Sequence, residues 1–256
     1  MIPLIHRCEK PEMTATELQR RPIEIGTFIK TPAPHIVEIL ALAGLDFAVL
    51  DAEHAPFDLS TLDVMLLAGR AAGLPLMVRV PDFQAATLLR TLDLGAHGVL
   101  VPHVDTADDA RNVVARCRYR AGVRGYSSAS RSSGYGEGSM AQTIEAADRV
   151  FIMCQIESAQ AVENAAEIAA TPEMGGIFIG RADLALSMGY EDTKHPAVLA
   201  AAEHAIAAGI AAGKRVGVVA TSQAERRHYA SLGVDWFLHA SDQALLKEAA
   251  RALMSS

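Results

Sequence analysis

Short apolar runs recur along the chain, and the longer segments between them carry apolar residues at spacings of three and four. Because the runs are apolar on both faces, they are typical of strands that are buried on both sides, as in a parallel sheet. The predicted strands are 24–28, 46–50, 75–79, 98–101, 151–156, 176–179, 215–219 and 234–238. The pattern therefore indicates an α/β fold.

The segments between these runs predict helices. The clearest ones are 33–43, 60–72, 84–93, 158–169, 197–212 and a last helix from Ser241 or Asp242 to about Met254. Ser60 is predicted as the N-cap of its helix, since a hydroxyl can accept the first free N–H groups. Gly44, Gly95 and Gly233 each follow an apolar helix end, where a left-handed residue is favoured.

Eight αβ units without an obvious reversal of strand order favour a single-domain (β/α)₈ TIM barrel over a doubly wound open sheet. We expect the barrel to span 23–256 and residues 1–22 to form an N-terminal extension. Residues 118–149 interrupt the alternation of predicted strands and helices. Their glycine and serine content indicates either an ordered functional loop or a flexible lid.

Composition narrows the functional classes. Half of the residues are hydrophobic, and the formal net charge of −7 argues against nucleic acid as the main partner. No stretch approaches the length of a membrane span, and residues 1–22 lack the apolar core of a signal peptide. The three cysteines (Cys8, Cys117 and Cys154) show no C-x-x-C spacing, which is typical of a reducing compartment. We expect a cytoplasmic protein with no membrane partner.

Functional groups of such a barrel lie at the C-terminal ends of the strands. The polar residues predicted there are Lys30, Asp51, Glu53, His54, Arg79, His103, Gln155, Glu157, Arg181 and Asp183. Glu157 and Asp183 follow neighbouring strands, and paired carboxylates are ligands that Mg²⁺, Mn²⁺ or Co²⁺ accepts. The alternative is that each carboxylate caps the helix that follows it.

Asp51 and His54 are close enough in sequence to form an acid–base pair, in which the carboxylate fixes the imidazole tautomer. The alternative is a surface ion pair at His54. Arg79 either pairs with Asp51 or Glu53, grips a substrate oxygen and stabilises an enolate, or does both. Lys30 offers a metal-free Schiff-base route, although a solvated lysine is the more ordinary interpretation.

The motifs LDAEH, VRV, GAHGVLVPHV, RYRAGVRG, QIES and FIGRADLALSMG resemble those of the class II, metal-dependent pyruvate aldolases over residues 24–254. That family includes 2,4-dihydroxyhept-2-ene-1,7-dioate aldolase, 2-dehydro-3-deoxyglucarate aldolase and macrophomate synthase. The resemblance implies that Glu157 and Asp183 bind the metal, and that His54 and Asp51 form the acid–base dyad. It implies substrate contacts from Arg79, Gln155, Gly180, Arg181, Ala182 and Phe28, the last near the substrate entrance.

The resemblance also implies that the C-terminal helix is exchanged between subunits, in hexamers built as trimers of dimers. The chain departs from the family at Arg181, where many members have proline, and at residues 1–22, which have no evident counterpart. Both departures concern the identity of the substrate more than the class of reaction.

We therefore expect a metal-dependent aldolase that cleaves a 4-hydroxy-2-oxo acid reversibly to pyruvate and an aldehyde, through a metal-bound pyruvate enolate, in aromatic or sugar-acid catabolism. The alternatives are an acyl-CoA lyase of the malyl or citryl type, an oxaloacetate decarboxylase, or a non-catalytic barrel that binds a 2-oxo acid. The same metal and enolate would serve each of the enzymatic alternatives.

Overall fold

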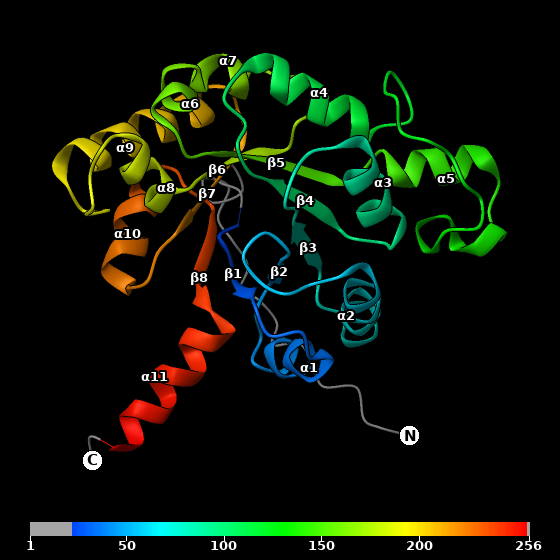
Figure 1. Cartoon of the computed structure of the whole chain (residues 1–256), viewed down its shortest axis with the longest axis horizontal. Coiled ribbons are helices and arrows are strands. Elements are labelled where there is room, and N and C mark those ends of the chain that lie inside the picture. Colours follow the sequence, from blue (N-terminus) through cyan, green and yellow to red (C-terminus); the bar gives the residue numbers. More distant parts are fainter. Residues whose placement is uncertain (1–21, 255–256) are drawn as a thin grey trace, which may run out of the picture.

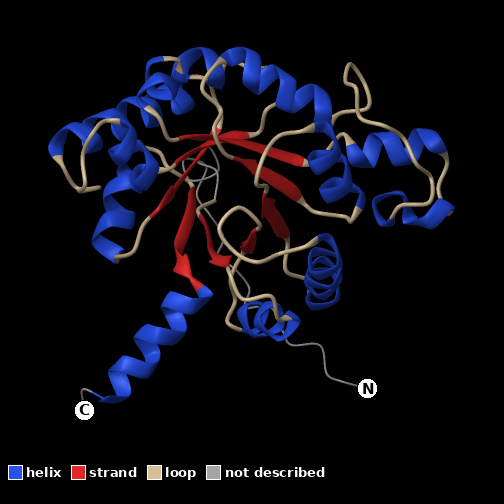
Figure 2. Cartoon of the chain, viewed as in Figure 1, coloured by secondary structure: helices blue, strands red, loops and turns tan. Residues whose placement is uncertain are grey.

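The computed structural model describes residues 22–254, and its centre is a closed barrel of parallel strands (Figure 2). The strands are hydrogen-bonded in chain order, and β1 pairs with β8 to close the barrel. They are β1 (Glu24–Ile29), β2 (Phe47–Asp51), β3 (Leu76–Arg79), β4 (Gly98–Val101), β5 (Phe151–Ile156), β6 (Gly176–Ile179), β7 (Arg215–Val219) and β8 (Trp236–Ser241). The prediction of a (β/α)₈ barrel is confirmed.

Helices surround the strands (Figure 1). They are α1 (Pro34–Leu42), α2 (Leu59–Ala72), α3 (Ala85–Asp93), α4 (Ala107–Cys117), α5 (Met140–Ala147), α6 (Ala159–Glu163), α7 (Ala165–Ala169), α8 (Arg181–Ser187), α9 (Pro196–Ala211), α10 (Gln223–Ser231) and α11 (Asp242–Met254). A 3₁₀ helix, η1 (Arg131–Gly136), precedes α5. The predicted helices are present with small shifts at the ends, except that the one predicted over 158–169 is divided into α6 and α7.

Two apolar layers explain why the strands read as continuous apolar runs. Along β2, Phe47 and Val49 point into the barrel, whereas Ala48 and Leu50 pack outward against the helices. The interior is filled by Phe28, Phe47, Val49, Met77, Leu100, Met153, Phe178, Trp236 and Leu238. The barrel is therefore a packed core with no pore, and any reaction must take place at one of its ends.

The residues at the helix ends agree with the sequence prediction only in part. The N-cap of α2 is Asp58, whose carboxylate accepts the Thr61 N–H at 2.7 Å, so the prediction of Ser60 was wrong. Both residue types suit this position, and nothing in their spacing distinguishes them. The three predicted left-handed glycines are confirmed, with φ values of +84° at Gly44, +88° at Gly95 and +99° at Gly233.

The predicted helix 158–169 is in fact two short helices, α6 and α7. They meet at Asn164, whose backbone leaves the helical region and whose side-chain amide donates to the carbonyl of Asp105 at 2.8 Å. Asparagine side chains commonly compete with the helix for backbone partners in this way.

The irregular segment 118–149 is ordered and carries η1 and α5. Arg118, at its start, donates to the carbonyls of Val150 and Glu173, both at 3.0 Å. Those carbonyls precede β5 and β6, so this part of the segment is fastened to the N-terminal end of the barrel. Of the two interpretations of this segment, its regular elements agree with an ordered loop.

Helix α11 projects away from the barrel (Figure 1). Its residues Leu246, Leu253 and Met254 are exposed, whereas Asp242 at its start is buried. No helix within residues 22–254 is both long and apolar enough to cross a membrane. The predicted N-terminal extension lies outside the described residues except for Pro22.

Candidate active site

The predicted site residues gather at the C-terminal rim of the barrel because β1 to β6 are neighbours in chain order. Lys30 follows β1, Asp51 ends β2 and Arg79 ends β3. Beyond them, His103 follows β4 and Glu157 follows β5. Parallel strands end at the same edge, so residues far apart in sequence lie at one rim.

Asp51 and Arg79 form a buried bidentate pair. They are direct register partners on β2 and β3. Asp51 accepts from Arg79 Nε at 3.0 Å and from Nη2 at 2.8 Å, and Lys30 Nζ lies 3.0 Å away. Burial by itself would raise the pKa of Asp51, but the hydrogen bonds and charge of Arg79, with Lys30 and the His54 N–H, hold it below its usual value. The predicted pairing of Arg79 with Asp51 is confirmed, and the guanidinium is held rigidly.

His54 lies close to Asp51, but the His54 imidazole does not contact the Asp51 carboxylate. Asp51 Oδ1 accepts the backbone N–H of His54 at 3.1 Å, whereas the ring Nε2 lies 3.6 Å from Glu53 Oε2. The His54 side chain is 51% exposed, so a ring nitrogen can reach a substrate. The structure therefore does not show the predicted Asp51–imidazole contact, because Arg79 and Lys30 already occupy the carboxylate of Asp51.

Glu53 and His103 connect the two halves of the rim. Glu53 was predicted only as a possible partner of Arg79, and His103 was given no role by the sequence. Glu53 lies 3.3 Å from Arg79 Nε and 3.3 Å from His103 Nε2. The other ring nitrogen of His103 lies 3.2 Å from Glu157 Oε1. His103 adopts a φ of +56°, which is uncommon for a residue with a side chain. Its place directly after β4 was the only sequence signal.

Glu157 does not cap a helix, so that alternative was wrong. Ser158 caps α6, and the Glu157 oxygens instead accept from the His103 N–H at 2.8 Å and from Gln155 Nε2. Burial raises the pKa of Glu157, and the nearby charge of Asp183 raises it further, against the hydrogen bonds from His103 and Gln155. Two carboxylates in one buried site repel each other unless a cation joins them.

Asp183 lies half-buried in the first turn of α8, whose N-cap is Gly180 and which has no side-chain capping bond. The chain passes very close to Glu157 at this point. A Cβ on Gly180 would lie 2.9 Å from Glu157 Cβ and 3.0 Å from its Oε2. Glycine at 180 therefore lets the backbone before Asp183 press against Glu157.

The carboxylate pair fits a hard divalent cation. Each oxygen of Glu157 accepts one hydrogen bond and keeps a second lone pair, and Gln155 Oε1 is buried without a hydrogen-bond partner among residues 22–254. Oxygen donors of this kind suit Mg²⁺ and Mn²⁺. Within the same residues no group of three or more histidine, cysteine, aspartate or glutamate side chains is arranged to hold a metal ion. Glu157 and Asp183 would be the protein's share of the ligands.

Lys30 and Arg181 are both held by acids. The ammonium of Lys30 is ion-paired with the carboxylate of Asp51 at 3.0 Å. Arg181 binds Glu225 and donates to the Val219 carbonyl at 3.0 Å. Arg181 thus fixes the start of α8 to the end of β7 and to α10.

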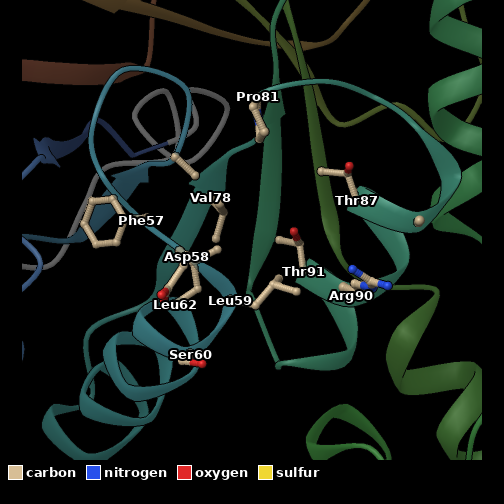
Figure 3. Close-up of a pocket in the computed structure, with 12 residues that line it drawn as sticks. Phe57, Asp58, Leu59, Ser60, Leu62, Val78, Pro81, Thr87, Arg90 and Thr91 are labelled. Carbon is tan, nitrogen blue, oxygen red and sulfur yellow. The ribbon is translucent and has the colours of Figure 1, made fainter.

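A cavity of about 270 Å³ is lined by part of this rim, including Arg79, Gln155 and Asp183. Phe28 lines it as a buried side chain, and its ring centroid lies 4.6 Å from the Arg79 guanidinium carbon. A larger cavity of about 570 Å³ lies outside the barrel between α2 and α3 (Figure 3). That cavity contains none of the rim acids, so we place the active site in the smaller one.

Comparison with known proteins identifies the family of the chain. Residues 24–249 match the family model of the HpcH/HpaI aldolase/citrate lyases. A 5-keto-4-deoxy-D-glucarate aldolase of Shigella dysenteriae is 35% identical over 246 residues, 95% of each chain. A solved HpcH/HpaI aldolase/citrate lyase family protein from Burkholderia cenocepacia is 33% identical with a TM-score of 0.87, covering 91% of this chain and 94% of that one. Macrophomate synthase superposes with a TM-score of 0.80 at 26% identity, covering 91% and 85%.

Fold, rim and relatives define a carbon–carbon lyase of the aldolase type, as the sequence predicted. The chain belongs to the HpcH/HpaI aldolase/citrate lyase family.

Proposed function

We propose that the protein cleaves a 4-hydroxy-2-oxo acid reversibly to pyruvate and an aldehyde. The observation that carries this proposal is the position of Arg79. Asp51 holds its guanidinium in two hydrogen bonds, and the same cavity is lined by Gln155 and Asp183. A fixed cation beside a carboxylate pair suits a substrate whose oxygen gains negative charge as a carbon–carbon bond breaks.

Glu157 and Asp183 would hold a divalent cation, Mg²⁺, Mn²⁺ or Co²⁺. When bound, such an ion supplies Lewis-acid polarisation of a carbonyl oxygen. The fit rests on the raised pKa of Glu157, the like charge of Asp183 and the oxygen donors described above.

In the cleavage direction, an imidazole nitrogen of His54 takes the proton of the C4 hydroxyl. The C3–C4 bond then breaks, C4 becomes the aldehyde carbon, and the electron pair remains on C3 as an enolate. Arg79 donates to the enolate oxygen, and return of a proton to C3 gives pyruvate. Glu53, 3.6 Å from the His54 ring, replaces Asp51 as the acid that orients the imidazole in this scheme.

The relatives named as 5-keto-4-deoxy-D-glucarate aldolases are the basis for proposing a sugar acid as substrate. Small-molecule partners also fit the net charge of −7, which disfavours nucleic acid. We place the reaction in the cytoplasm, where such substrates are metabolised.

We further propose a homo-oligomer in which α11 of one subunit packs on its neighbour, as in a hexamer of three dimers. Exposed apolar side chains on α11 support this arrangement, together with exposed Ile39 and Leu42 on α1. An exposed apolar stripe on a projecting helix is typical of a subunit contact. We also propose that residues 1–22 are an extension outside the catalytic barrel 23–256.

The test is exchange of deuterium into the pyruvate methyl group in D₂O, followed by NMR with added Mn²⁺ or Mg²⁺ and with EDTA. We expect exchange that requires the metal. Exchange that survives EDTA would point to Lys30 and Schiff-base chemistry instead. No exchange at all would contradict the proposal and favour a donor other than pyruvate, such as an acyl-CoA.

A further inference from the structure

Helix α8 carries Asp183 but begins without a side-chain cap. It is seven residues long, and helices of that length are marginal by themselves. A Cβ at its N-cap, Gly180, would lie 2.9 Å from Glu157 Cβ. A serine or aspartate that could cap the helix therefore has no room at this position. The first turn needs contacts with other elements to hold it in place.

The side chain of Arg181 supplies those contacts. Arg181 Nη2 donates to the Val219 carbonyl at 3.0 Å and to a carboxylate oxygen of Glu225. The guanidinium carbon also lies 5.3 Å from the centroid of the Tyr229 ring. The side chain is only 12% exposed, so water competes little for these bonds. The first residue of α8 is thus bonded to the end of β7 and to α10.

Glu225, the acid in this contact, is itself fixed by the backbone before α10. Its Oε2 accepts the Thr221 N–H at 2.9 Å, and its own N–H donates to Oγ of Ser222, the N-cap of α10, at 3.1 Å. This reciprocal arrangement is similar to a capping box. Arg181 is therefore bonded to a rigid acceptor, whereas a surface acid would move with its side chain.

The other end of α8 is bonded to the neighbouring unit of the barrel. Ser187 Oγ accepts the N–H of Ala159, in the first turn of α6, at 3.0 Å. Asp183 lies between the two ends, near enough to Glu157 for its charge to raise the pKa of that acid. Where Asp183 lies relative to Glu157 therefore depends on how α8 is held between α6 and β7.

We propose that Arg181 is a positioning residue for the metal site. Its bonds to β7 and α10 hold the first turn of α8 where Asp183 can share a cation with Glu157. This inference rests on the proposed metal-dependent function, and it gives the Arg181 side chain no contact with the reacting atoms. The sign of the charge makes it testable. A guanidinium that acted only through its charge would repel a metal ion, whereas one that positions a ligand strengthens metal binding.

The test is the affinity of the EDTA-treated protein for Mn²⁺, measured by calorimetry and by the EPR signal of the free ion. We expect Arg181→Met to lower the affinity about 10- to 100-fold, as for other residues that support a metal ligand. Arg181→Gln removes the same charge but keeps a donor for the Val219 carbonyl, so it should remain folded and lose less affinity. An unchanged or raised affinity in either variant would overturn the inference.

Two further comparisons make the result specific. Arg215→Met removes a half-buried arginine that bridges Glu24 and Asp235 at the N-terminal end of β7, and it should leave the affinity within about twofold. An equal loss in this control would overturn the inference, because it would indicate a general effect on the fold. In a Glu225→Gln background, Arg181→Met should cost clearly less affinity than it does alone, since the two side chains act through one ion pair. Fully additive losses would overturn the inference as well.

Failure of the proposed function is visible separately. If the unmodified protein binds no Mn²⁺, or if Glu157→Gln binds it normally, the metal site is not at these acids and the inference falls with it. If Mn²⁺ binding requires Glu157 but is unaffected in Arg181→Met, only the positioning role of Arg181 is contradicted.

Discussion

The two ends of the barrel carry the same kinds of charged side chain, yet these side chains bond to different partners. At the N-terminal end, Arg118 and Lys214 donate to backbone carbonyls in the segments that lead into β5 and β6. At the C-terminal end, Asp51, Arg79 and Glu53 meet one another side chain to side chain across neighbouring strands. A cation that donates to carbonyls fastens the chain, whereas acids and cations that share a pocket can respond to a substrate.

At the C-terminal end, the pKa values of two acids are shifted in opposite directions. The pKa of Asp51 is lowered because the charge and hydrogen bonds of its partners outweigh burial, whereas the pKa of Glu157 is raised by burial and by Asp183. Opposite directions within one pocket are typical of groups with different tasks. Asp51 is a fixed counter-ion of Arg79, and Glu157 is the acid that we propose as a metal ligand.

The largest expected effect comes from Glu157→Gln, which keeps the shape of the side chain and removes its charge. Loss of a supporting residue around a metal typically lowers affinity about 10- to 100-fold, so loss of a ligand should exceed that and abolish metal-dependent exchange. Titration with Mn²⁺ by calorimetry measures the first effect and NMR the second. Normal metal affinity in this variant would contradict the ligand assignment.

His54→Ala should lower kcat by about 10²–10⁴ while Mn²⁺ affinity stays near normal, because the imidazole moves a proton and is not assigned as a ligand. The matched control is His204→Ala on α9, a helix outside the barrel interior. A large loss of metal affinity in His54→Ala would instead make His54 a ligand. Together the two variants distinguish a histidine at the reactive rim from a histidine on an outer helix.

Asp51→Asn should destabilise the protein by about 3–5 kcal/mol at neutral pH, because it leaves Arg79 buried beside a neutral group. A carboxyl whose pKa is lowered by folding contributes stability above its ordinary pKa and loses it as the pH falls through the folded value. The difference in unfolding free energy from the unmodified protein should therefore shrink on acidification. Denaturant unfolding at several pH values measures it.

Asp108→Asn provides the control for that series, since Asp108 and Arg111 form an exposed pair on α4. Such surface pairs contribute about 0–1 kcal/mol. If this variant lost as much unfolding free energy as Asp51→Asn, the contrast between a buried rim pair and a surface pair would be contradicted.

The smallest effect on chemistry should come from Arg118→Met at the opposite end. We expect it to lower stability by about 1–3 kcal/mol, because the carbonyls of Val150 and Glu173 lose their donor. The kcat of the folded enzyme should remain within about twofold. Thermal unfolding and steady-state kinetics on the same sample test this, and a large fall in kcat would mean that the two ends are coupled.

The sequence predicted all eight strands and the rim residues, because strands buried on both faces leave a continuous apolar run that ends at a polar residue. It could not decide between Arg79 and His54 as partner of Asp51. The register of β2 on β3 decides it, since Asp51 and Arg79 are directly opposite, whereas the His54 ring lies beyond a turn. The bridge through Glu53 and His103 depends on a left-handed backbone at His103, which no periodicity encodes.

Closure of the barrel joins the two ends of the described chain. Asp242, after β8, accepts the N–H groups of Lys30 and Thr31 at 2.8 and 3.1 Å, and Thr27 donates its hydroxyl hydrogen to the carbonyl of His239. During synthesis β1 therefore waits for nearly the whole chain to leave the ribosome before its last partner exists. A product that terminates before β8 presents two open strand edges, and we expect it to aggregate rather than to form a smaller barrel.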